Sequence, residues 1–427
     1  MKRSRLLGLV AIGAAAAIAL SACSTSAPTP KGKTTLTMLT FNTPALTPAF
    51  WDGSIKSALK GIPGVAVKQV VSPDADRNAY AKKLQASGQF PDIQSSITAG
   101  DFVAAKLLKP FPQSWLDENF ILPNGNAIGG KSYIPPTNSQ IIPLVYYNKA
   151  IFAKNNITVP KTYGQFLTAV KALRAAGVTP IELDGADPWA ASMPIVALAS
   201  VDVLGKDPQW ITKRYAGSVK FTDSNFVAAM QKEEDLIKLG AYSPTALSVD
   251  YAGANKDFLA GGAGMYLMGS WFDGSSYMTP AQAAGFGVVP FPSASGKIIV
   301  PFNSGGTTSV SAKSKDVSAA VKFAESWSLA PANLKTLIET DGAYPMMKKE
   351  PLSSFHATVN SLYTTSYKLV TDKNEKVDAF GWVGNSQTLA PGIADKFYAL
   401  SQGLFSNSDV KSQLAALDAA WDTATGK

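Results

Sequence analysis

Cysteine and histidine are nearly absent from this chain of 427 residues, which contains one of each, Cys23 and His356. A single cysteine excludes a disulfide within the chain, and tetrahedral structural zinc needs about four cysteine or histidine ligands. No acidic loop has the spacing of a calcium site. The sequence therefore predicts a protein without an internal disulfide, a metal or another cofactor.

Charged residues are also scarce, at 16% of the chain, against about 25% in an ordinary globular domain. The formal net charge is +8, and Lys2, Arg3 and Arg5 supply three of these charges, which leaves +5 for the rest of the chain. Because this excess is not gathered into a basic run, nucleic acid is not an expected partner. Apolar residues make up 46% of the chain, as in folded proteins, and the length suits two or three domains.

The N-terminus has the pattern of an export signal. Basic residues are followed by an apolar stretch over residues 6–20, which is short for a membrane-spanning helix and typical of a signal peptide. Next come Leu20, Ser21, Ala22 and Cys23, which resemble the bacterial lipobox, where a peptidase cuts and the cysteine receives diacylglycerol. We predict a signal peptide over residues 1–22 and lipidation of Cys23. The alternative is an ordinary secretory signal with an incidental cysteine.

A flexible tether follows the lipidation site. Residues 23–33 contain no apolar periodicity, and ten extended residues reach about 33 Å. Two acyl chains on one cysteine give a stable anchor. We therefore expect the folded body at the outer face of the cytoplasmic membrane, on the periplasmic side if the cell has an outer membrane. No other segment has the length and hydropathy to span a bilayer.

Strand and helix patterns alternate at the start of the body. Residues 34–41 and 65–71 are predicted strands, and a short strand is expected around Ile93. Residues 49–60 and 74–87 have helical spacing and end at glycines. This β-α-β-α-β order predicts a mixed, largely parallel sheet covered by helices.

Later segments continue the alternation. Thr162 and Gln165 fit a capping box at the start of a helix that runs to Ala176, and a strand is predicted over residues 178–183. Residues 225–239 and 317–329 are predicted amphipathic helices. Trp327 lies within the second of these and is predicted to be a core residue.

A phosphate-loop pattern is present but has the wrong context. Residues 125–132 (GNAIGGKS) match G-x-x-x-x-G-K-S, which requires a strand before it and a helix after it to hold phosphates. Pro135 and Pro136 follow within four residues of the serine and prevent that helix. We interpret the segment as a glycine-rich turn leading into an extended stretch.

Catalytic patterns are weak. His356 lies in a polar stretch without a glycine elbow, which does not favour a Ser-His-Asp triad. Asp184, Asp187 and Asp273 are available as paired carboxylates for a glycoside hydrolase, but sequence spacing does not set their separation. A surface-anchored carbohydrate-active enzyme and a structural or adhesive lipoprotein therefore stay open as alternatives.

An ordered set of motifs from Thr34 to about Trp421 resembles the extracellular solute-binding proteins of ABC importers, in particular the carbohydrate-binding, maltose-binding-protein-like family. The matching segments are 87–93 (SGQFPDI), 143–149 (PLVYYNK) with Phe152, 160–166 (PKTYGQF, with Tyr163 where the family has Trp), 177–181 (GVTPI), 258–271 (FLAGGAGMYLMGSW) and 342–345 (GAYP). The resemblance implies a type II periplasmic-binding-protein-like α/β fold, with two lobes that are each a mixed sheet flanked by helices.

The resemblance also implies that the chain crosses between the lobes about three times. We expect these crossings near residues 136–140, 302–306 and 340–345, where Pro, Gly or small polar residues occur. Each lobe is then discontinuous. The N-terminal lobe is predicted to comprise residues 34–137 and 305–342, and the C-terminal lobe residues 138–304 and 343–427.

By the same resemblance, the protein captures a sugar or oligosaccharide between its lobes and delivers it to the transmembrane subunits of an ABC permease. It is expected to be a monomer and not an enzyme. Aromatic rings cover the C–H faces of a sugar, whereas amides, hydroxyls and carboxylates bind its hydroxyl groups. The predicted ligand-binding residues are Asn42, Ser96, Asp101, Asp184, Trp189, Trp271, Asp273, Gly305, Gly306, Tyr344 and Trp382. The sequence does not identify the sugar.

Overall fold

The computed structural model of the chain describes residues 34–73, 76–406 and 409–427. The predicted signal peptide over residues 1–22, the lipidation of Cys23 and the whole predicted tether over residues 23–33 lie outside the described residues. Within the part of the chain that is described, no helix combines the length and the hydropathy that a bilayer crossing needs.

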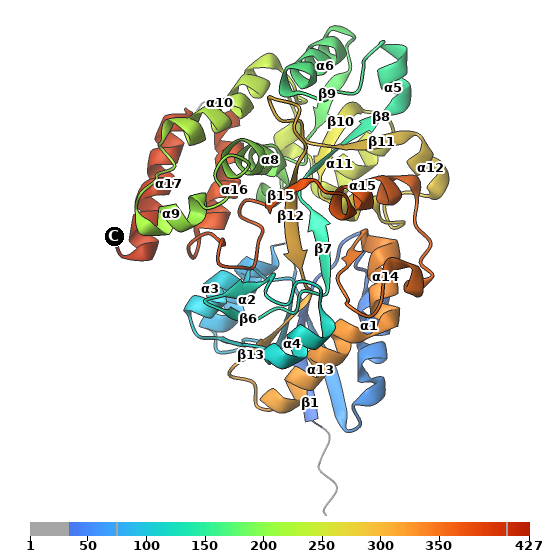
Figure 1. Cartoon of the computed structure of the whole chain (residues 1–427), viewed down its shortest axis with the longest axis vertical. Helices are drawn as coiled ribbons and strands as arrows, with labels where there is room; N and C mark the ends of the chain where they lie inside the picture. Colours follow the sequence, from blue (N-terminus) through green and yellow to red (C-terminus); the bar gives the residue numbers. More distant parts are fainter. Residues whose placement is uncertain (1–33, 74–75, 407–408) are drawn as a thin grey trace, which may run out of the picture.

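The lower half of the molecule in Figure 1 is built on a five-stranded sheet in the order β2-β1-β3-β13-β4. Its strands are β1 (Thr34–Thr40), β2 (Val65–Val71), β3 (Ile93–Ser95), β4 (Leu108–Lys109) and β13 (Thr308–Ser311). Strand β1 is parallel to both of its neighbours, whereas β13 is antiparallel to β3 and β4. The mixed, largely parallel sheet predicted for the start of the body is therefore confirmed.

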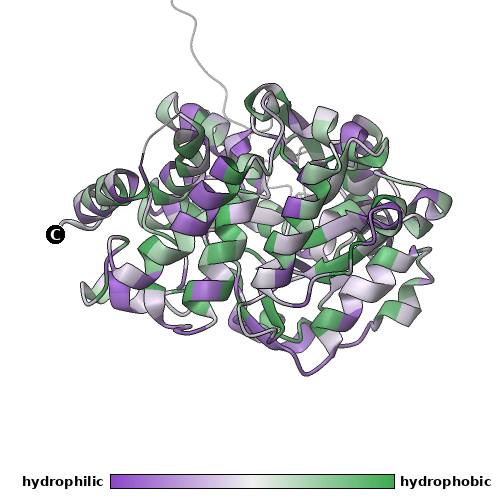
Figure 2. Cartoon of the chain, turned by 90° about the horizontal axis from the view of Figure 1, so that it is seen from above, coloured by the Kyte–Doolittle hydropathy of each residue, from purple (hydrophilic) through white to green (hydrophobic). Residues whose placement is uncertain are grey.

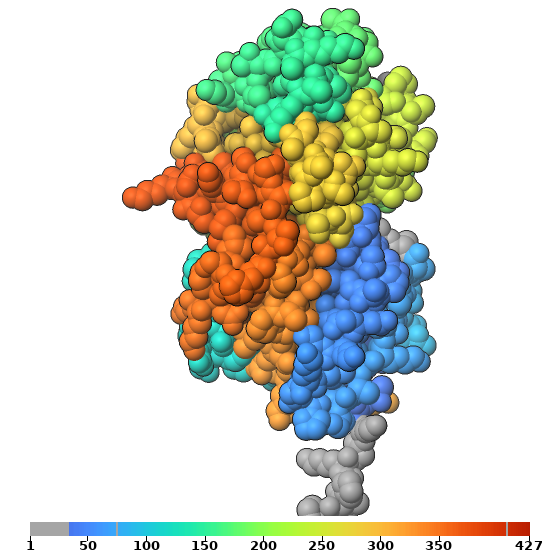
Figure 3. Space-filling model, turned by 90° about the vertical axis from the view of Figure 1, so that its right-hand side faces the viewer, coloured from blue at the N-terminus to red at the C-terminus, as the bar shows by residue number. Residues whose placement is uncertain are grey.

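The helices of the lower half come from two distant parts of the chain. They are α1 (Pro48–Ala58), η1 (Leu59–Gly61), α2 (Arg77–Ala86), α3 (Ala99–Ala104), α4 (Gln113–Asn119), α13 (Val317–Leu329) and α14 (Pro331–Asp341). The Ser326 hydroxyl donates to the Ala58 carbonyl at 2.7 Å, and Trp327 stacks on Trp51 with ring centroids 6.0 Å apart. Figure 3 shows this late segment, in orange, lying against the blue N-terminal segment. Trp327 is 2% exposed, so its prediction as a core residue is confirmed.

The upper half has a four-stranded sheet in the order β11-β8-β10-β9. Its strands are β8 (Leu144–Asn148), β9 (Thr179–Glu182), β10 (Ala263–Met268) and β11 (Phe286–Pro290). The surrounding helices are α5 (Lys149–Lys154), α6 (Tyr163–Ala175), α7 (Pro188–Ala191), α8 (Met193–Leu198), η2 (Ala199–Leu204), α9 (Trp210–Ala216), α10 (Ser224–Leu239), η3 (Ala246–Ser248), α11 (Tyr251–Leu259), η4 (Ser270–Asp273), α12 (Pro280–Ala284), α15 (Ser361–Thr371), α16 (Ile393–Phe405) and α17 (Val410–Thr425). The short helix η5 (Leu352–Phe355) lies against α14 of the lower half, where the Lys335 side chain donates to the His356 carbonyl at 2.8 Å.

A third sheet, in the order β14-β7-β12-β15, links the halves. Its strands are β7 (Asn138–Ile141), β12 (Ile299–Gly305), β14 (Tyr344–Pro345) and β15 (Glu375–Asp378). Strands β7 and β12 run between the two halves in Figure 1, and the three stretches predicted as crossings overlap β7, β12 and β14. The lobe limits given above stay a prediction.

Local sequence signals set several of these elements. In α6 the Thr162 hydroxyl accepts from the Gln165 backbone amide, and the Gln165 side chain accepts from the Thr162 backbone amide, so the predicted capping box is confirmed. Along α13, Ala320, Phe323 and Trp327 face the core. Figure 2 shows the same mixture of apolar and polar colours along most helices.

The phosphate-loop pattern forms a hairpin. Strand β5 (Ala127–Ile128) pairs antiparallel with β6 (Lys131–Ser132), and both residues between them, Gly129 and Gly130, have positive φ. Such a turn favours glycine at both central positions. No helix follows β6 directly, so the interpretation as a glycine-rich turn is confirmed.

Candidate functional site

Three of the tryptophans predicted to bind ligand lie together. Trp189 is the second residue of α7, which follows β9; Trp271 lies in η4 after β10, and Trp382 lies in the loop after β15. Their ring centroids are 5.6 Å apart for Trp271 and Trp382, 6.1 Å for Trp189 and Trp382, and 6.2 Å for Trp189 and Trp271. Because β9 and β10 are parallel neighbours, their carboxyl ends meet at one edge of the sheet and bring the first two tryptophans together.

Tyrosines extend this cluster on both sides. Tyr251 lies 5.0 Å from Trp189, and Tyr277 lies 6.1 Å from Tyr251, between ring centroids. On the other side, Tyr398 of α16 lies 5.9 Å from Trp382. We call these six residues the aromatic wall: Trp189, Tyr251, Trp271, Tyr277, Trp382 and Tyr398.

Two indole N–H groups of the aromatic wall make no hydrogen bond within the described residues. They are Nε1 of Trp189 and Nε1 of Trp382, and both atoms are buried although the residues are partly exposed. Buried polar groups in folded proteins nearly always have a partner. The buried core residues Trp210 and Trp421 also have unpartnered indole N–H groups, so what distinguishes the wall is its partly exposed ring faces.

Two charged residues of the lower half have shifted pKa values. Arg77 is the first residue of α2, and its guanidinium carbon lies 4.3 Å from the centroid of the Phe41 ring. Burial lowers the pKa of Arg77 to about 10, although Asp76, Asp341 and Tyr398 act against this change. Burial raises the pKa of Asp341 to about 7, opposed by Arg77 and by a hydrogen bond from Gln140.

Tyr277 connects the other end of the wall to the lower half. Burial, followed by the charge of Asp341, raises the pKa of the Tyr277 hydroxyl, and a hydrogen bond with Thr43 opposes this rise. Thr43 lies just after β1, at the carboxyl end where ligands bind in open α/β sheets. The Ser275 backbone amide also donates to the Glu339 carbonyl of α14 at 2.7 Å, so the segment that carries Tyr277 contacts the lower half.

Ion pairs also join the halves. Lys82 of α2 lies 2.7 Å from a carboxylate oxygen of Asp101 and 2.9 Å from one of Asp395, which belongs to α16 in the upper half. Asp101 in turn accepts a hydrogen bond from the Gly392 backbone amide at 3.0 Å. The predicted site residue Asp101 thus lies at a contact between the halves, where its carboxylate already has partners.

Two predicted site residues, Asp273 and Tyr344, lie inside the protein. Asp273 accepts from the Tyr146 hydroxyl at 2.8 Å, from the Tyr344 hydroxyl at 3.5 Å and from Ser366. Burial raises the pKa of Asp273 to about 7. The 3-10 helix η4 turns Asp273 toward these partners, whereas Trp271 of the same helix lies in the aromatic wall.

Asp184 is also buried, at 1% exposure. One carboxylate oxygen accepts from the Tyr266 hydroxyl at 3.2 Å, and the other has no hydrogen-bond partner among the described residues. Burial raises the pKa of Asp184 to about 8. Asp184 follows β9 by two residues, on the same segment that leads to Trp189.

The other predicted site residues lie in the lower half and in the linking sheet. Asn42 is exposed at the end of β1, and Ser96 has a φ of 51°, with its carbonyl accepting from Nε of Arg77 at 2.6 Å. A Cβ on Gly305 would lie 2.3 Å from Asn138, and one on Gly306 would lie 2.1 Å from the Pro135 carbonyl. These two glycines therefore admit a close approach of neighbouring backbone, and no contact places them at the aromatic wall.

Metal and triad chemistry find no support in the described residues. No group of three or more His, Cys, Asp or Glu side chains is arranged to hold a metal ion in the part of the chain that is described. His356 is exposed at the end of η5. Asp187 accepts from the Tyr251 backbone amide at 2.9 Å.

A family model for bacterial extracellular solute-binding proteins matches residues 54–362, more than two thirds of the chain. The chain belongs to this family. A "Multiple sugar-binding protein" of Streptococcus mutans serotype c is 23% identical to this solute-binding protein over 372 residues, which cover 80% of this chain and 83% of the relative. A "Probable sugar-binding periplasmic protein" of Mesorhizobium japonicum is 24% identical over 230 residues, covering 51% of this chain and only 54% of the relative.

The fold of this solute-binding protein is shared with solved structures. A chitin oligosaccharide binding protein superimposes with a TM-score of 0.79 at 21% identity, covering 93% of this chain and 100% of its own. The predicted two-lobed type II α/β fold is therefore confirmed.

Sequence reasoning missed three tyrosines of the wall in this solute-binding protein, and two charged residues of the lower half with shifted pKa values. The tyrosines are Tyr251, Tyr277 and Tyr398, and the charged residues are Arg77 and Asp341. A usable signal existed for Arg77, because a helix that follows a parallel strand begins at the carboxyl edge of the sheet. The two tyrosines Tyr251 and Tyr398 lie in amphipathic helices, where a ring at helical spacing has the same pattern as a core residue.

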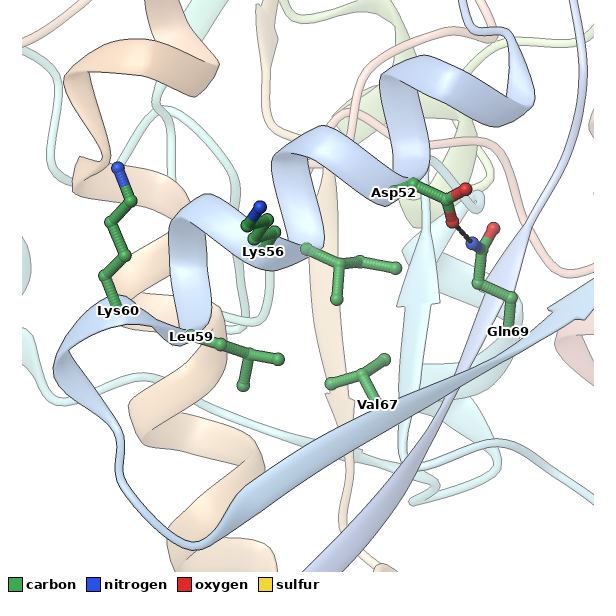
Figure 4. A pocket seen from close by; sticks show the side chains of 7 residues that line it. Asp52, Lys56, Leu59, Lys60, Val67 and Gln69 are labelled. Atoms are coloured by element: carbon green, nitrogen blue, oxygen red, sulfur yellow. Dashed lines mark hydrogen bonds between the residues drawn. The ribbon is translucent and has the colours of Figure 1, made fainter.

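A separate hollow of this solute-binding protein lies between α1 and β2 (Figure 4). It is lined by Asp52, Ile55, Lys56, Leu59, Lys60, Val67 and Gln69. The Asp52 carboxylate accepts from the Gln69 amide at 2.8 Å. No residue of the aromatic wall lines this hollow.

Proposed function

We propose that this solute-binding protein captures a neutral sugar or oligosaccharide between its two halves and delivers it to the transmembrane subunits of an ABC permease. The observation that carries the proposal is the convergence of Trp189, Trp271 and Trp382 from three separate segments. The names of both relatives, "Multiple sugar-binding protein" and "Probable sugar-binding periplasmic protein", support the same ligand class.

The aromatic wall supplies enough contact for this role. Capture at about 1 μM requires about 8 kcal/mol. Stacked rings and several hydrogen bonds provide this energy, less the cost of ordering the ligand. Closure of the halves excludes water and is driven by ligand contacts that exist only in the closed state.

The burial of the candidate carboxylates favours a binding protein over a hydrolase. Of the residues considered for a glycoside hydrolase, Asp184 is 1% exposed and Asp273 is 2% exposed, and Asp187 accepts from the Tyr251 backbone amide at 2.9 Å. A hydrolase needs one carboxyl group that reaches the glycosidic oxygen and a second on the other side of the bond. The burial of Asp184 and Asp273 supports a protein that releases its ligand unchanged.

We also propose that the mature chain is a monomer held at the membrane by lipid on Cys23. The order of basic residues, an apolar stretch and Leu-Ser-Ala-Cys supports this, and so does membership of an extracellular family. In cells fed radiolabelled palmitate, the full wild-type chain should carry label and the Cys23→Ser chain should carry none. Equal labelling of the two chains, or no label on the wild type, would contradict the anchor and leave the ligand proposal intact.

A sugar panel tests the binding function. The purified body is heated with maltotriose, xylotriose, raffinose and N,N′-diacetylchitobiose, and a binding ligand raises the melting temperature. The sugar is then recovered and analysed by chromatography. We expect at least one sugar to stabilise the protein and to return unchanged. Cleaved sugar would indicate the hydrolase instead, and no stabilisation by any neutral sugar would remove the proposal.

A further inference from the structure

We propose that helix α16 positions two tryptophans of the aromatic wall, Trp189 and Trp382, for stacking on the ligand. The positioning residues are Tyr398, Ser401 and Gln402, each of which donates a hydrogen bond to a backbone carbonyl beside one of these tryptophans. This inference rests on the proposed sugar-binding function and extends it by assigning residues that act on the ligand through the wall.

The segment that carries Trp189 is bound to α16 on both sides of the ring. Before the tryptophan, the Gln402 side-chain amide donates to the Gly185 carbonyl at 2.7 Å. After it, the Ser401 hydroxyl donates to the Ala191 carbonyl at 2.7 Å. Because two neighbouring residues of one helix bind the backbone on either side of Trp189, the position of α16 sets the position of this ring.

The loop that carries Trp382 is bound to the same helix one turn earlier. The Tyr398 hydroxyl donates to the Gly381 carbonyl at 2.7 Å. Phe380 is 1% exposed, and its ring centroid lies 4.9 Å from that of Phe397 in α16. Gly381 has a φ of 79°, a left-handed conformation that favours glycine. This turn lets the chain pass from the buried Phe380 to the partly exposed Trp382 while α16 holds both sides of the turn.

The three donors lie on one face of α16. Tyr398, Ser401 and Gln402 are three and four positions apart, a spacing that places side chains on the same side of a helix. The helix packs against α7, and the rings of Trp189 and Trp382 lie 6.1 Å apart. One helix therefore sets the spacing of two rings that come from distant parts of the chain.

These hydrogen bonds affect binding through preorganisation. A ring that is already held in its binding position avoids the loss of conformational entropy that a mobile ring would incur when the ligand orders it. Removal of one of these hydrogen bonds should therefore weaken sugar binding although no ligand contact is deleted.

The test compares Ser401→Ala, Gln402→Met and Tyr398→Phe by isothermal titration calorimetry with maltotriose, xylotriose, raffinose and N,N′-diacetylchitobiose. Ser326→Ala in α13 of the lower half is the matched control. The Ser326 hydroxyl also donates from a helix to the backbone carbonyl of a distant segment, that of Ala58, and at the same distance of 2.7 Å. Circular dichroism and melting temperature establish that each variant is folded.

We expect each of the three variants to weaken binding of a neutral sugar about three- to tenfold, the effect of losing about one hydrogen bond. The control should lower the melting temperature and bind the sugar within twofold of wild type. The control thus separates a loss of binding geometry from a general loss of stability.

Double variants show whether α16 acts through the tryptophans. In a Trp189→Ala background, Ser401→Ala and Gln402→Met should each change the affinity less than twofold, because the ring that they position is absent. In a Trp382→Ala background, Tyr398→Phe should likewise have less than a twofold effect. A general structural defect would weaken binding equally in the wild-type and the tryptophan-free backgrounds.

The outcomes separate this inference from the proposed function. If wild type binds no sugar, the proposed function fails and the inference fails with it. If wild type binds a neutral sugar and the three folded variants bind it within twofold, the function stands and the positioning role of α16 is overturned. An equal loss in the Ser326→Ala control, or an undiminished loss in the tryptophan-free backgrounds, also overturns that role. Should Ser401→Ala not fold, Gln402→Met and Tyr398→Phe decide.

Discussion

The tryptophans of the aromatic wall differ in their expected contributions to the free energy of ligand binding and to the free energy of folding. Trp271 is 9% exposed and packs between its neighbours, whereas Trp382 is more open and lies in a loop. We expect Trp382→Ala to remove about 2 kcal/mol of apolar contact with the sugar, a loss of about thirtyfold in affinity. Titration of the best ligand of the panel measures this loss.

Trp115 offers the matched control for this substitution. It is also partly exposed, but it packs on Phe111 and Phe120 in the lower half. Trp115→Ala should lower the melting temperature and leave the dissociation constant within twofold of wild type. An unchanged affinity for Trp382→Ala, or an equal loss for both variants, would refute the assigned role of Trp382.

Buried carboxyl groups make folding stability depend on pH. Glu233 is fully buried, accepts from the Tyr242 hydroxyl at 2.8 Å, and has a pKa that burial raises to about 8. Between about pH 4.5 and 8 the unfolded chain loses this proton while the folded chain keeps it, so the free energy of unfolding falls as pH rises.

Glu233→Gln should flatten this dependence by up to about 1.4 kcal/mol per pH unit in that range. Chemical denaturation at pH 5, 6, 7 and 8 measures the slope. The control is the neighbouring Glu234→Gln. Side-chain hydrogen bonds from Lys238 and Gln231 lower the pKa of Glu234, so its titration changes the free energy of unfolding only at a more acidic pH than this range. If Glu233→Gln and wild type have equal slopes, Glu233 is ionised in the folded protein.

At the scale of elements, α2 and α16 hold the halves together through Lys82. An ion pair between exposed groups is worth about 0–1 kcal/mol, and the Lys82–Asp395 pair joins different halves. Lys82→Ala should therefore weaken sugar binding about two- to fivefold through faster release. The difference in affinity between Lys82→Ala and wild type should be smaller in 0.5 M salt, because salt screens the attraction between exposed charges.

Stopped-flow release of the sugar measures this effect. Lys238→Ala removes an ion pair with Glu234 inside α10 and serves as the control, with no expected change in release. If Lys82→Ala releases the sugar at the wild-type rate at low salt, the pair contributes nothing to closure.

The elements whose signals are local were predictable from the sequence. The Thr162–Gln165 capping box, strand β2 and helix α13 depend on caps and periodicity within one segment. The convergence of the tryptophans depends on the order of the strands in the sheet, which the pattern of a single segment does not contain. The family resemblance indicated that the tryptophans lie together. Nothing in the sequence indicated that η4 directs the Asp273 side chain inward, where it accepts a hydrogen bond from Tyr146.

At the scale of the whole molecule, the linking sheet is the element that closure must bend. Strands β7 and β12 are paired antiparallel along their length, and both run between the halves (Figure 1). Other contacts between the halves, such as Asp101 with Gly392 and Ser386 with the Ala127 carbonyl, are single hydrogen bonds. The sheet can therefore stay intact while these weaker contacts break and the halves separate.

This division of strong and weak contacts predicts a change of shape on binding. Without ligand, a population with separated halves should raise the radius of gyration, and a sugar that contacts both halves should shift the protein to the closed state. Small-angle scattering at saturating sugar should show a smaller radius of gyration than without sugar, and the Lys82→Ala protein should show a larger radius than wild type when no sugar is present. A sugar that raises the melting temperature but leaves the scattering curve of the wild type unchanged would mean that the ligand binds to halves that are already closed.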